Sequence, residues 1–214
     1  MNKILKINEW KKYVFIWIQG SGKWTQARLL EEKYDFKLFE SWTALRNIAS
    51  ENSDLWKSVK ETIDAWNHVS PAIVEDIMVD ILENKSDWKN TIFDGFVRNI
   101  WNKNSADKVL WEYIVVLFEL SEEKARDRLL WRMYNPKTWE TFKSWVKIDP
   151  ETWDKLEKRA DDNEEAIVKR IDLYTDKALP LINEYRENWN LIEINADQSV
   201  ENVFSELVKK LNLK

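Results

Sequence analysis

The chain has 214 residues, a formal net charge of -5 and an isoelectric point near 5.2. This length suits one α/β domain with modest insertions and excludes two unrelated full-size domains. The acidic balance argues against a general nucleic-acid or membrane surface, and a chain without cysteine holds no disulfide framework and no thiolate zinc site. The segment 1–8 carries no long apolar stretch after its lysines, so we expect a cytoplasmic protein without a secretion or membrane segment.

Two residue counts are out of proportion, because the chain has 14 Trp and only 3 Gly. Glycine is about 7% of an average protein, and the two counts together come close to that share. Several Trp stand among charged or turn-forming neighbours where glycine is favoured, at Trp66, Trp139, Trp153 and Trp189. Three interpretations stay open: a Trp-rich core, a deliberate replacement of Gly by Trp, or codons such as UGA that encode glycine in the source organism but are written here as Trp. We favour the last.

Apolar runs and helical periodicity define the expected elements in chain order. A run at 13–18 predicts a strand, and helical spacing from Thr25 to Tyr34 predicts a helix after it. Further strands are predicted at 37–39, 91–93, 113–117 and 191–194, with helical stretches between them. Strands that alternate with helices predict a three-layer α/β/α fold around a mostly parallel, five-stranded sheet. Two polar stretches, after residue 40 and after residue 130, interrupt the alternation and are predicted to be insertions that move against the core.

The segment 17–25 lies between the first predicted strand and the first predicted helix, which is the context of a phosphate-binding loop. Glycines let successive backbone N–H groups turn toward a phosphate, the helix N-terminus adds partial positive charge, and Lys23 can reach the β- and γ-phosphates. With glycine at Trp17 and Trp24, the loop would read G-x-x-G-x-G-K-G-T. A plain glycine turn before a helix is the alternative.

This loop resembles that of the adenylate kinases, which reads G-x-P-G-x-G-K-G-T-Q. Gly20, Gly22, Lys23, Thr25 and Gln26 match that pattern, while Gln19 replaces the proline. The resemblance extends through essentially the whole chain and implies a P-loop fold, Mg²⁺ as cofactor, ATP and AMP as substrates, and a monomer. It implies a core of 1–39, 70–130 and 163–214, an NMP-binding insertion at 40–69 and a lid at 131–162.

The resemblance also assigns an acceptor side. The segment 39–46 is similar to the family's I-S-T-G-D-x-L-R, with Ser41 at the acceptor nucleotide and Arg46 on its phosphate, although Glu40 and Thr43 depart from the pattern. The segment 94–98 is similar to D-G-F-P-R and implies that Asp94 holds Mg²⁺ through water, together with Thr25, and that Arg98 binds the AMP phosphate. Asn102 stands where a glutamine usually reads the adenine.

The donor side is assigned in the same way. Arg128 and Arg132 are four apart on a predicted helix and face one direction, and the resemblance implies contacts with the donor adenine and its phosphates. The region from Arg159 to Arg170 is similar to R-x-D-D-x-E-x-x-x-x-R, in which both arginines clamp phosphates and the two aspartates, Asp161 and Asp162, hold the closed lid. The remaining expected nucleotide contacts are Gly20, Ser21, Gly22, Trp24, Gly95 and Gln198.

The expected chemistry is phosphoryl transfer by positioning and charge neutralisation. The catalytic cations implied by the resemblance are Lys23, Arg98, Arg132, Arg159 and Arg170. A chain without cysteine resembles the members whose lid holds no structural zinc, and the single His68 receives no role. Alternatives are a kinase for UMP or CMP, a GTP-dependent AMP kinase, and a non-catalytic nucleotide-binding relative disabled by Trp at glycine positions.

Overall fold

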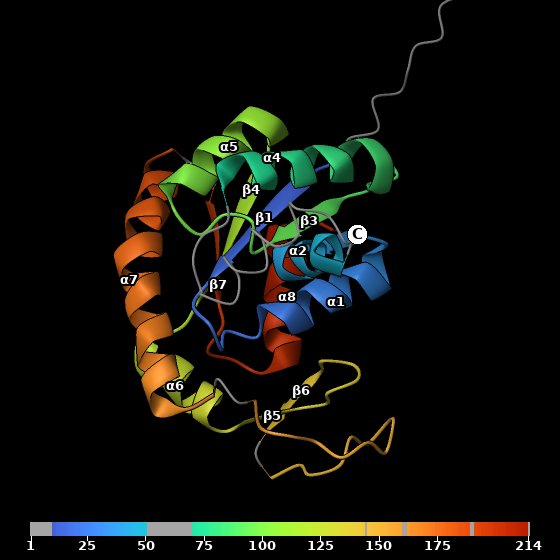
Figure 1. The fold of residues 1–214 in the computed structure, drawn as a ribbon, viewed down its shortest axis with the longest axis vertical. Coiled ribbons are helices and arrows are strands. Elements are labelled where there is room, and N and C mark those ends of the chain that lie inside the picture. Colours follow the sequence, from blue (N-terminus) through green and yellow to red (C-terminus); the bar gives the residue numbers. More distant parts are fainter. Residues whose placement is uncertain (1–9, 51–69, 144, 160–161, 189–190, 214) are drawn as a thin grey trace, which may run out of the picture.

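The structure, a computed structural model, describes residues 10–50, 70–143, 145–159, 162–188 and 191–213 (Figure 1). Five strands form one sheet in the order β2-β3-β1-β4-β7, and every pairing in it is parallel. The strands are β1 (Lys12–Trp17), β2 (Lys37–Glu40), β3 (Thr91–Asp94), β4 (Ile114–Glu119) and β7 (Leu191–Asn195). The predicted five-stranded sheet is confirmed.

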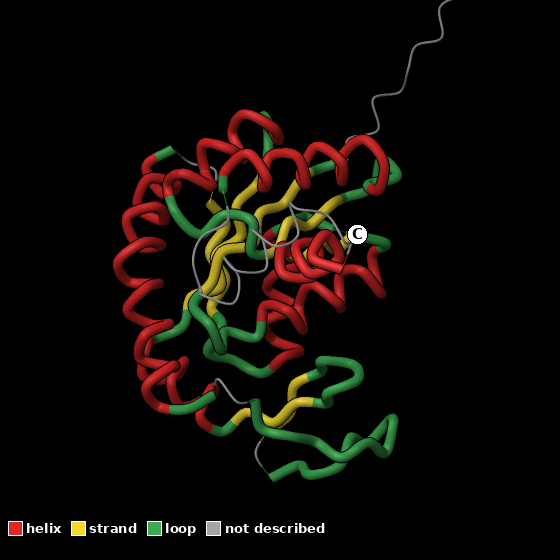
Figure 2. The backbone as a smooth tube through the Cα atoms, in the orientation of Figure 1, coloured by secondary structure: helices red, strands yellow, loops and turns green. Residues whose placement is uncertain are grey.

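Helices cover both faces of the sheet (Figure 2). They are α1 (Lys23–Tyr34), α2 (Ser41–Ser50), α4 (Pro71–Asp80), the π-helical η1 (Ile81–Lys85), α5 (Ile100–Leu110), α6 (Glu122–Leu130), α7 (Glu164–Glu187) and α8 (Val200–Lys210). Successive side chains of a strand point to opposite faces. In β1, Val14 and Ile16 therefore pack with α4, α5 and α7, while Tyr13 and Phe15 pack with α1 and α8. The three-layer α/β/α architecture is confirmed.

The carboxyl ends of the central strands meet at one edge of the sheet. Glu40 at the end of β2 is in register with Asp94 at the end of β3, and Asp94 is in register with Phe15 of β1. The chain leaves β1 for one side of the sheet and later returns to β4 on the other side. Ligands of open α/β sheets bind at such a reversal of strand order, outside the carboxyl ends.

A second, two-stranded sheet lies beyond this edge (Figure 1). Its antiparallel strands are β5 (Arg132–Tyr134) and β6 (Thr141–Lys143), and an isolated bridge joins Tyr134 to Glu157. The whole excursion from β5 to α7 belongs to the stretch that the sequence predicts as an insertion.

Two turns in this excursion have the same construction, a repeat that was not predicted from the sequence. Asn135 begins N-P-K-T-W and Asp149 begins D-P-E-T-W. In each turn the fifth residue donates its backbone N–H to the carbonyl of the first, at 2.8 Å for Trp139 and 2.9 Å for Trp153. The side chain of Asn135 donates to the Asp149 carboxylate at 2.7 Å and to the Thr152 hydroxyl at 3.0 Å, so that one turn is fastened to the other.

The interpretation of a Trp-rich core is wrong for the part of the chain in which Trp side chains are described. The buried core is aliphatic with Phe and Tyr and contains none of these Trp. The exposed ones have 42–85% of their surface accessible and are Trp88, Trp101, Trp111, Trp131, Trp139, Trp145 and Trp153. Aromatic side chains that stabilise a fold are normally buried, so these Trp do not contribute to the core.

Several predictions fall on residues outside the described ranges. These are the N-terminal segment 1–8, most of the insertion at 40–69, His68, Asp161, and the turn contexts at Trp66 and Trp189.

Candidate functional site

A cavity of about 2100 Å³ opens at the carboxyl edge of the sheet. Its walls come from the loop after β1, the start of α2, the β3–α5 loop, α6, the 131–162 excursion and α7. Sites for one small molecule are typically about 300–1,000 Å³, so this cavity has room for two nucleotide-sized ligands. The expected site residues that line it are Gly20, Ser21, Gly22, Lys23, Trp24, Thr25, Ser41, Gly95, Arg98, Asn102, Arg128, Arg132, Arg159, Arg170 and Gln198.

The loop after β1 has the conformation that an anion-binding loop requires. Gly20 and Gly22 have φ of 88° and 82°, in the left-handed region that favours glycine. A Cβ on Gly20 would lie 2.9 Å from the backbone oxygen of Ala125, so no other residue fits there. Gly22 is the N-cap of α1, which directs the first backbone N–H groups of that helix toward the loop.

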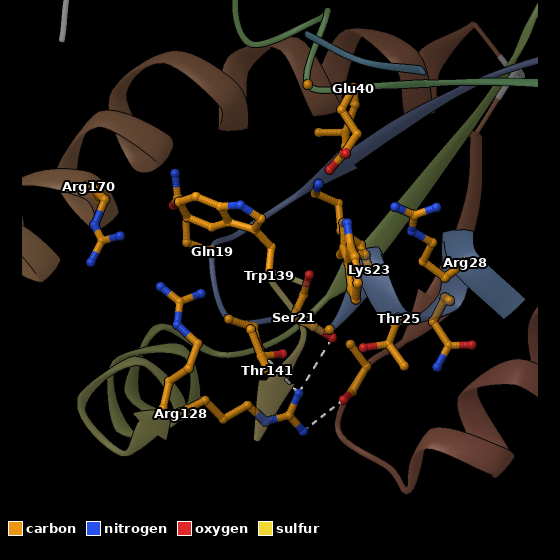
Figure 3. A pocket seen from close by; sticks show the side chains of 18 of the residues that line it. Gln19, Ser21, Lys23, Thr25, Arg28, Glu40, Arg128, Trp139, Thr141 and Arg170 are labelled. Atoms are coloured by element: carbon orange, nitrogen blue, oxygen red, sulfur yellow. Dashed lines mark hydrogen bonds between the residues drawn. The ribbon is translucent and has the colours of Figure 1, made fainter. Parts of the chain in front are cut away.

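Lys23 lines the cavity and forms an ion pair with Asp94, which is buried and is not one of the residues that line it (Figure 3 labels Lys23). The side chain of Lys23 is 12% exposed and that of Asp94 is 3% exposed. Burial lowers the pKa of Lys23, and the charge of Asp94 opposes that shift. The second carboxylate oxygen of Asp94, Oδ1, is buried and accepts no hydrogen bond within the described part of the chain.

These residues fit a hydrated Mg²⁺ ion. Mg²⁺ is bound through one or two carboxylates plus substrate phosphates and keeps several of its waters. The buried Oδ1 of Asp94 is a carboxylate oxygen without a hydrogen-bond partner in the described ranges, and the hydroxyl-bearing Thr25 lines the cavity. No group of three or more His, Cys, Asp or Glu side chains suited to a metal ion occurs among the described residues.

Arg98 and Ser41, the two residues expected to contact the acceptor nucleotide, meet in the structure although 57 positions separate them. The guanidinium of Arg98 donates to the Gly95 carbonyl at 2.9 Å and to the Ser41 hydroxyl at 3.5 Å. Burial lowers the pKa of Arg98, but an arginine stays charged in proteins. Asn102 is buried beside it and accepts the Arg98 backbone N–H at 3.4 Å. The side chain of Arg46 lies outside what the structure describes.

Arg128 on α6 joins the phosphate-binding loop to the loop after β7. Its guanidinium donates to the carbonyls of Gly20 at 3.3 Å and Ala196 at 2.9 Å (Figure 3). Gln198, in the same loop, donates to the Asn195 carbonyl at 3.0 Å and to the Glu206 carboxylate at 2.7 Å. Arg128 therefore holds the loop after β1 against the loop after β7.

Asp162 brings two further arginines together. Arg132 donates to both of its oxygens, at 2.8 and 2.7 Å, and Arg170 donates at 3.0 Å. The Asp162 side chain is fully buried, and its ion pairs with Arg132 and Arg170 connect β5 to α7. Arg159 lies over the rings of Tyr134 and Trp139, at 5.2 and 5.3 Å from the centroids. All three arginines face the cavity.

Two features of the cavity were not predicted from the sequence. Tyr134 and Trp139 form the aromatic platform under Arg159, and Glu40 lines the cavity near Lys23. No periodic pattern could have indicated the platform, because β5 and β6 are three residues each. The position of Glu40 directly after the predicted strand 37–39 could have indicated that it lies near Lys23.

No helix among the described residues is long and apolar enough to cross a membrane.

Known proteins similar to this chain include several that are named adenylate kinase. The family profile described as adenylate kinase matches residues 16–190. An adenylate kinase of Azobacteroides pseudotrichonymphae genomovar. CFP2 is 31% identical over 198 residues, which cover 90% of this chain and 93% of the relative. An adenylate kinase of Mycoplasma mobile is 29% identical over 215 residues, covering 94% and 98% respectively. An adenylate kinase of Thermoanaerobacter sp. (strain X514) is 29% identical over 205 residues, covering 90% and 94%.

Proposed function

Because the chain belongs to the adenylate kinase family of nucleoside monophosphate kinases, we propose that it catalyses the reversible, Mg²⁺-dependent reaction of ATP and AMP to two ADP. The observation that carries this proposal is the meeting of Lys23 with arginines from distant segments around a cavity with room for two nucleotides. Those arginines are Arg98, Arg128, Arg132, Arg159 and Arg170.

The proposed step needs no nucleophile from the protein. An oxygen of the AMP phosphate attacks the γ-phosphorus of ATP, the bond from that phosphorus to the β-phosphate oxygen breaks, and both nucleotides leave as ADP. Catalysis of this kind consists of in-line positioning and neutralisation of charge on the transferred group. Lys23 of the loop after β1 and Arg98 of the β3–α5 loop line the cavity, as do Arg132 of β5 and Arg170 of α7.

Three of the cations of this cavity are paired with the protein's own carboxylates. Asp94 pairs with Lys23, and Asp162 pairs with Arg132 and Arg170. We propose that nucleotide phosphates take over part of these contacts. Asp94 and Thr25 would hold the hydrated Mg²⁺, which neutralises donor phosphate charge when bound.

We further propose that the segments 40–69 and 131–162 are the NMP-binding and lid domains and that they close over the nucleotides. Water competes with AMP as acceptor of the phosphoryl group, so closure has to exclude it. The arginines of 131–162 would then approach the donor phosphates. This division leaves 1–39, 70–130 and 163–214 as the core.

The preference for AMP as acceptor depends on Asn102. Asn102 stands at the adenine-reading position and is shorter than the usual glutamine, and its oxygen already accepts the Arg98 N–H. UMP and CMP are therefore the competing acceptors. Initial rates of ADP formation from ATP, measured with AMP, UMP, CMP and GMP in turn, test the assignment. We expect AMP to give the highest kcat/KM by at least tenfold, and equal or higher kcat/KM with UMP or CMP would overturn it.

A further inference from the structure

Two carboxylates, rather than one, lie at the carboxyl ends of β2 and β3 beside Lys23. Glu40 is the register partner of Asp94 across these two strands. Its side chain extends into the cavity toward the Lys23 ammonium (Figure 3), and its charge raises the pKa of that group against the effect of burial. Glu40 and Lys23 thus both line the cavity, and Lys23 is paired with the buried Asp94 behind the lining residues.

Thr43 orients Glu40 from the first turn of α2. Its hydroxyl donates to the Glu40 carboxylate oxygen Oε2 at 3.3 Å. In the segment I-S-T-G-D to which 39–43 is similar, a hydroxyl residue stands at the position of Glu40 and a carboxylate at the position of Thr43. The two chemical groups have exchanged places in this chain, and the carboxylate now extends from the end of a strand.

We propose that Glu40 is a second carboxylate for the hydrated Mg²⁺ of the bound nucleotide, acting through water beside Asp94. This inference rests on the proposed Mg²⁺-nucleotide binding. Its geometric basis is the buried Oδ1 of Asp94, which has no hydrogen-bond partner in the described part of the chain, next to a carboxylate in strand register. Mg²⁺ accepts one or two carboxylates while keeping most of its waters. Lys23 and Arg98 balance the two negative charges.

Binding of Mn²⁺ to the protein–ATP complex, followed by electron paramagnetic resonance, tests this role without turnover. Removing one outer ligand weakens metal binding by about 10- to 100-fold in strongly coupled sites. For Glu40→Gln, whose contact would pass through water, we expect a weakening of at least threefold. Asp94→Asn is expected to weaken it more. Glu32→Gln is the matched control, because Glu32 is exposed on α1 and does not line the cavity.

ATP binding in EDTA separates a metal role from a general electrostatic one. Glu40→Gln should leave metal-free ATP affinity unchanged or raise it, since the variant removes negative charge near the phosphates. Unchanged Mn²⁺ affinity, or equal loss of ATP affinity with and without metal, would overturn the proposal. The titration needs no acceptor, so a chain that binds ATP but does not phosphorylate AMP would still give the answer.

A second and independent observation concerns the backbone at four tryptophans. Seven described non-glycine residues have positive φ, and four of them are Trp88, Trp111, Trp139 and Trp153, at 57°, 59°, 65° and 60°. A bulky side chain in this region is an outlier, because its Cβ crowds the following carbonyl oxygen. Trp88, Trp111 and Trp153 are 71–85% exposed, so little burial compensates that crowding. Trp139 is 42% exposed and keeps the contacts of its ring with Tyr134 and Arg159 in spite of the crowding.

The twin turns show why two of these positions need that conformation. Residue one of each turn caps the N–H groups of residues three and four: Asn135 accepts at 2.9 and 3.4 Å, and Asp149 accepts at 2.9 and 3.2 Å. The fifth residue must then turn its N–H back to the first carbonyl, which places Trp139 and Trp153 in the left-handed region. Glycine adopts this region without steric cost.

We infer that Trp88, Trp111, Trp139 and Trp153 are glycine in the protein that the source organism makes, because their codons are read there as glycine. The nucleotide sequence at the four positions is the first test. UGA at all four supports the inference, and UGG at these positions contradicts it.

Thermal unfolding of the chain with all its Trp residues, and of single Trp→Gly variants, tests whether a Trp with positive φ destabilises the fold. We expect Trp139→Gly and Trp153→Gly each to raise Tm by about 2–4 °C, the shift that corresponds to relief of one left-handed side chain in a chain of this size. Trp101→Gly is the matched control: Trp101 is 68% exposed in α5, where glycine weakens a helix, so Tm should fall or stay unchanged. Equal shifts at 101, 139 and 153 would overturn the inference.

Discussion

Asn135 is the side chain on which the excursion between β5 and α7 depends most. It is fully buried, donates to Asp149, Thr152 and Asp154, and caps its own turn by accepting the N–H groups of Lys137 and Thr138. None of these hydrogen-bond partners belongs to a strand of the five-stranded sheet. We therefore predict that Asn135→Ala opens this excursion locally and leaves the five-stranded sheet intact.

The size of the effect follows from the hydrogen bonds that the substitution removes. A neutral hydrogen bond contributes about 0.5–1.5 kcal/mol net and one to a charged group about 1.5–3 kcal/mol. The hydrogen bonds of Asn135 share one side chain and are not additive, so we expect local opening to become easier by about 2–4 kcal/mol. At tenfold per 1.4 kcal/mol, local opening becomes roughly 30- to 700-fold more frequent.

Amide hydrogen exchange resolves this effect residue by residue. The reporters are the backbone N–H groups of Trp139, Trp153 and Glu157, which are bonded to carbonyls within the excursion at 2.8–2.9 Å. Their protection factors should fall roughly 30- to 700-fold, while the amides of β1 and β4 keep their protection. Asn84→Ala is the control, since Asn84 makes an exposed hydrogen bond to Asp80 in a different region. Unchanged protection at the three reporters, or an equal loss in the sheet, would refute the reasoning.

Three further predictions concern single groups. Lys23→Met should lower kcat at least 100-fold in a steady-state assay, because loss of one preorganised donor costs about 2.7–4 kcal/mol of transition-state stabilisation; a loss below tenfold would contradict the role. Arg98→Lys should raise KM for AMP at least tenfold with KM for ATP unchanged, since lysine cannot keep the Gly95 and Ser41 contacts together; equal changes in both would argue against an acceptor-side role. The hydrogen bond from Asn135 lowers the pKa of Asp149. The ionised Asp149 carboxylate therefore stabilises the folded excursion above about pH 3.9, and this stabilisation is lost as pH falls through the lowered pKa. Hydrogen exchange between pH 6 and 3 should show this loss, and Asp149→Asn, already weakened at pH 6, should show a smaller pH dependence.

The sheet could be predicted from the sequence because its strands are buried apolar runs between helical periods. Val14 and Phe93 are each part of such a run, and their neighbours alone indicate a strand. The phosphate-binding loop was equally local, since Gly20, Gly22 and Lys23 are nearly consecutive. The family resemblance supplied the distant arginines, whose partners no periodicity indicates.

The fastened turns and the ion pairs of Asp162 could not be predicted, because they depend on contacts between polar residues that are far apart in the sequence. Asn135 and Asp149 are 14 positions apart, and Arg132 and Asp162 are 30 apart, with no apolar pattern between them that fixes the path of the chain. The composition indicated that Trp occupies glycine positions in general. Only the backbone angles distinguish Trp111 and Trp153, which need glycine, from Trp101, which does not.

The most direct test of the proposed reaction is ³¹P nuclear magnetic resonance of ATP, AMP and Mg²⁺ with the chain carrying glycine at Trp17 and Trp24 of the loop and at Trp88, Trp111, Trp139 and Trp153. We predict that the ATP and AMP signals decrease together while both are converted into ADP, that no inorganic phosphate accumulates, and that EDTA stops the change. Release of inorganic phosphate with AMP unchanged, or no reaction at all, would contradict the account.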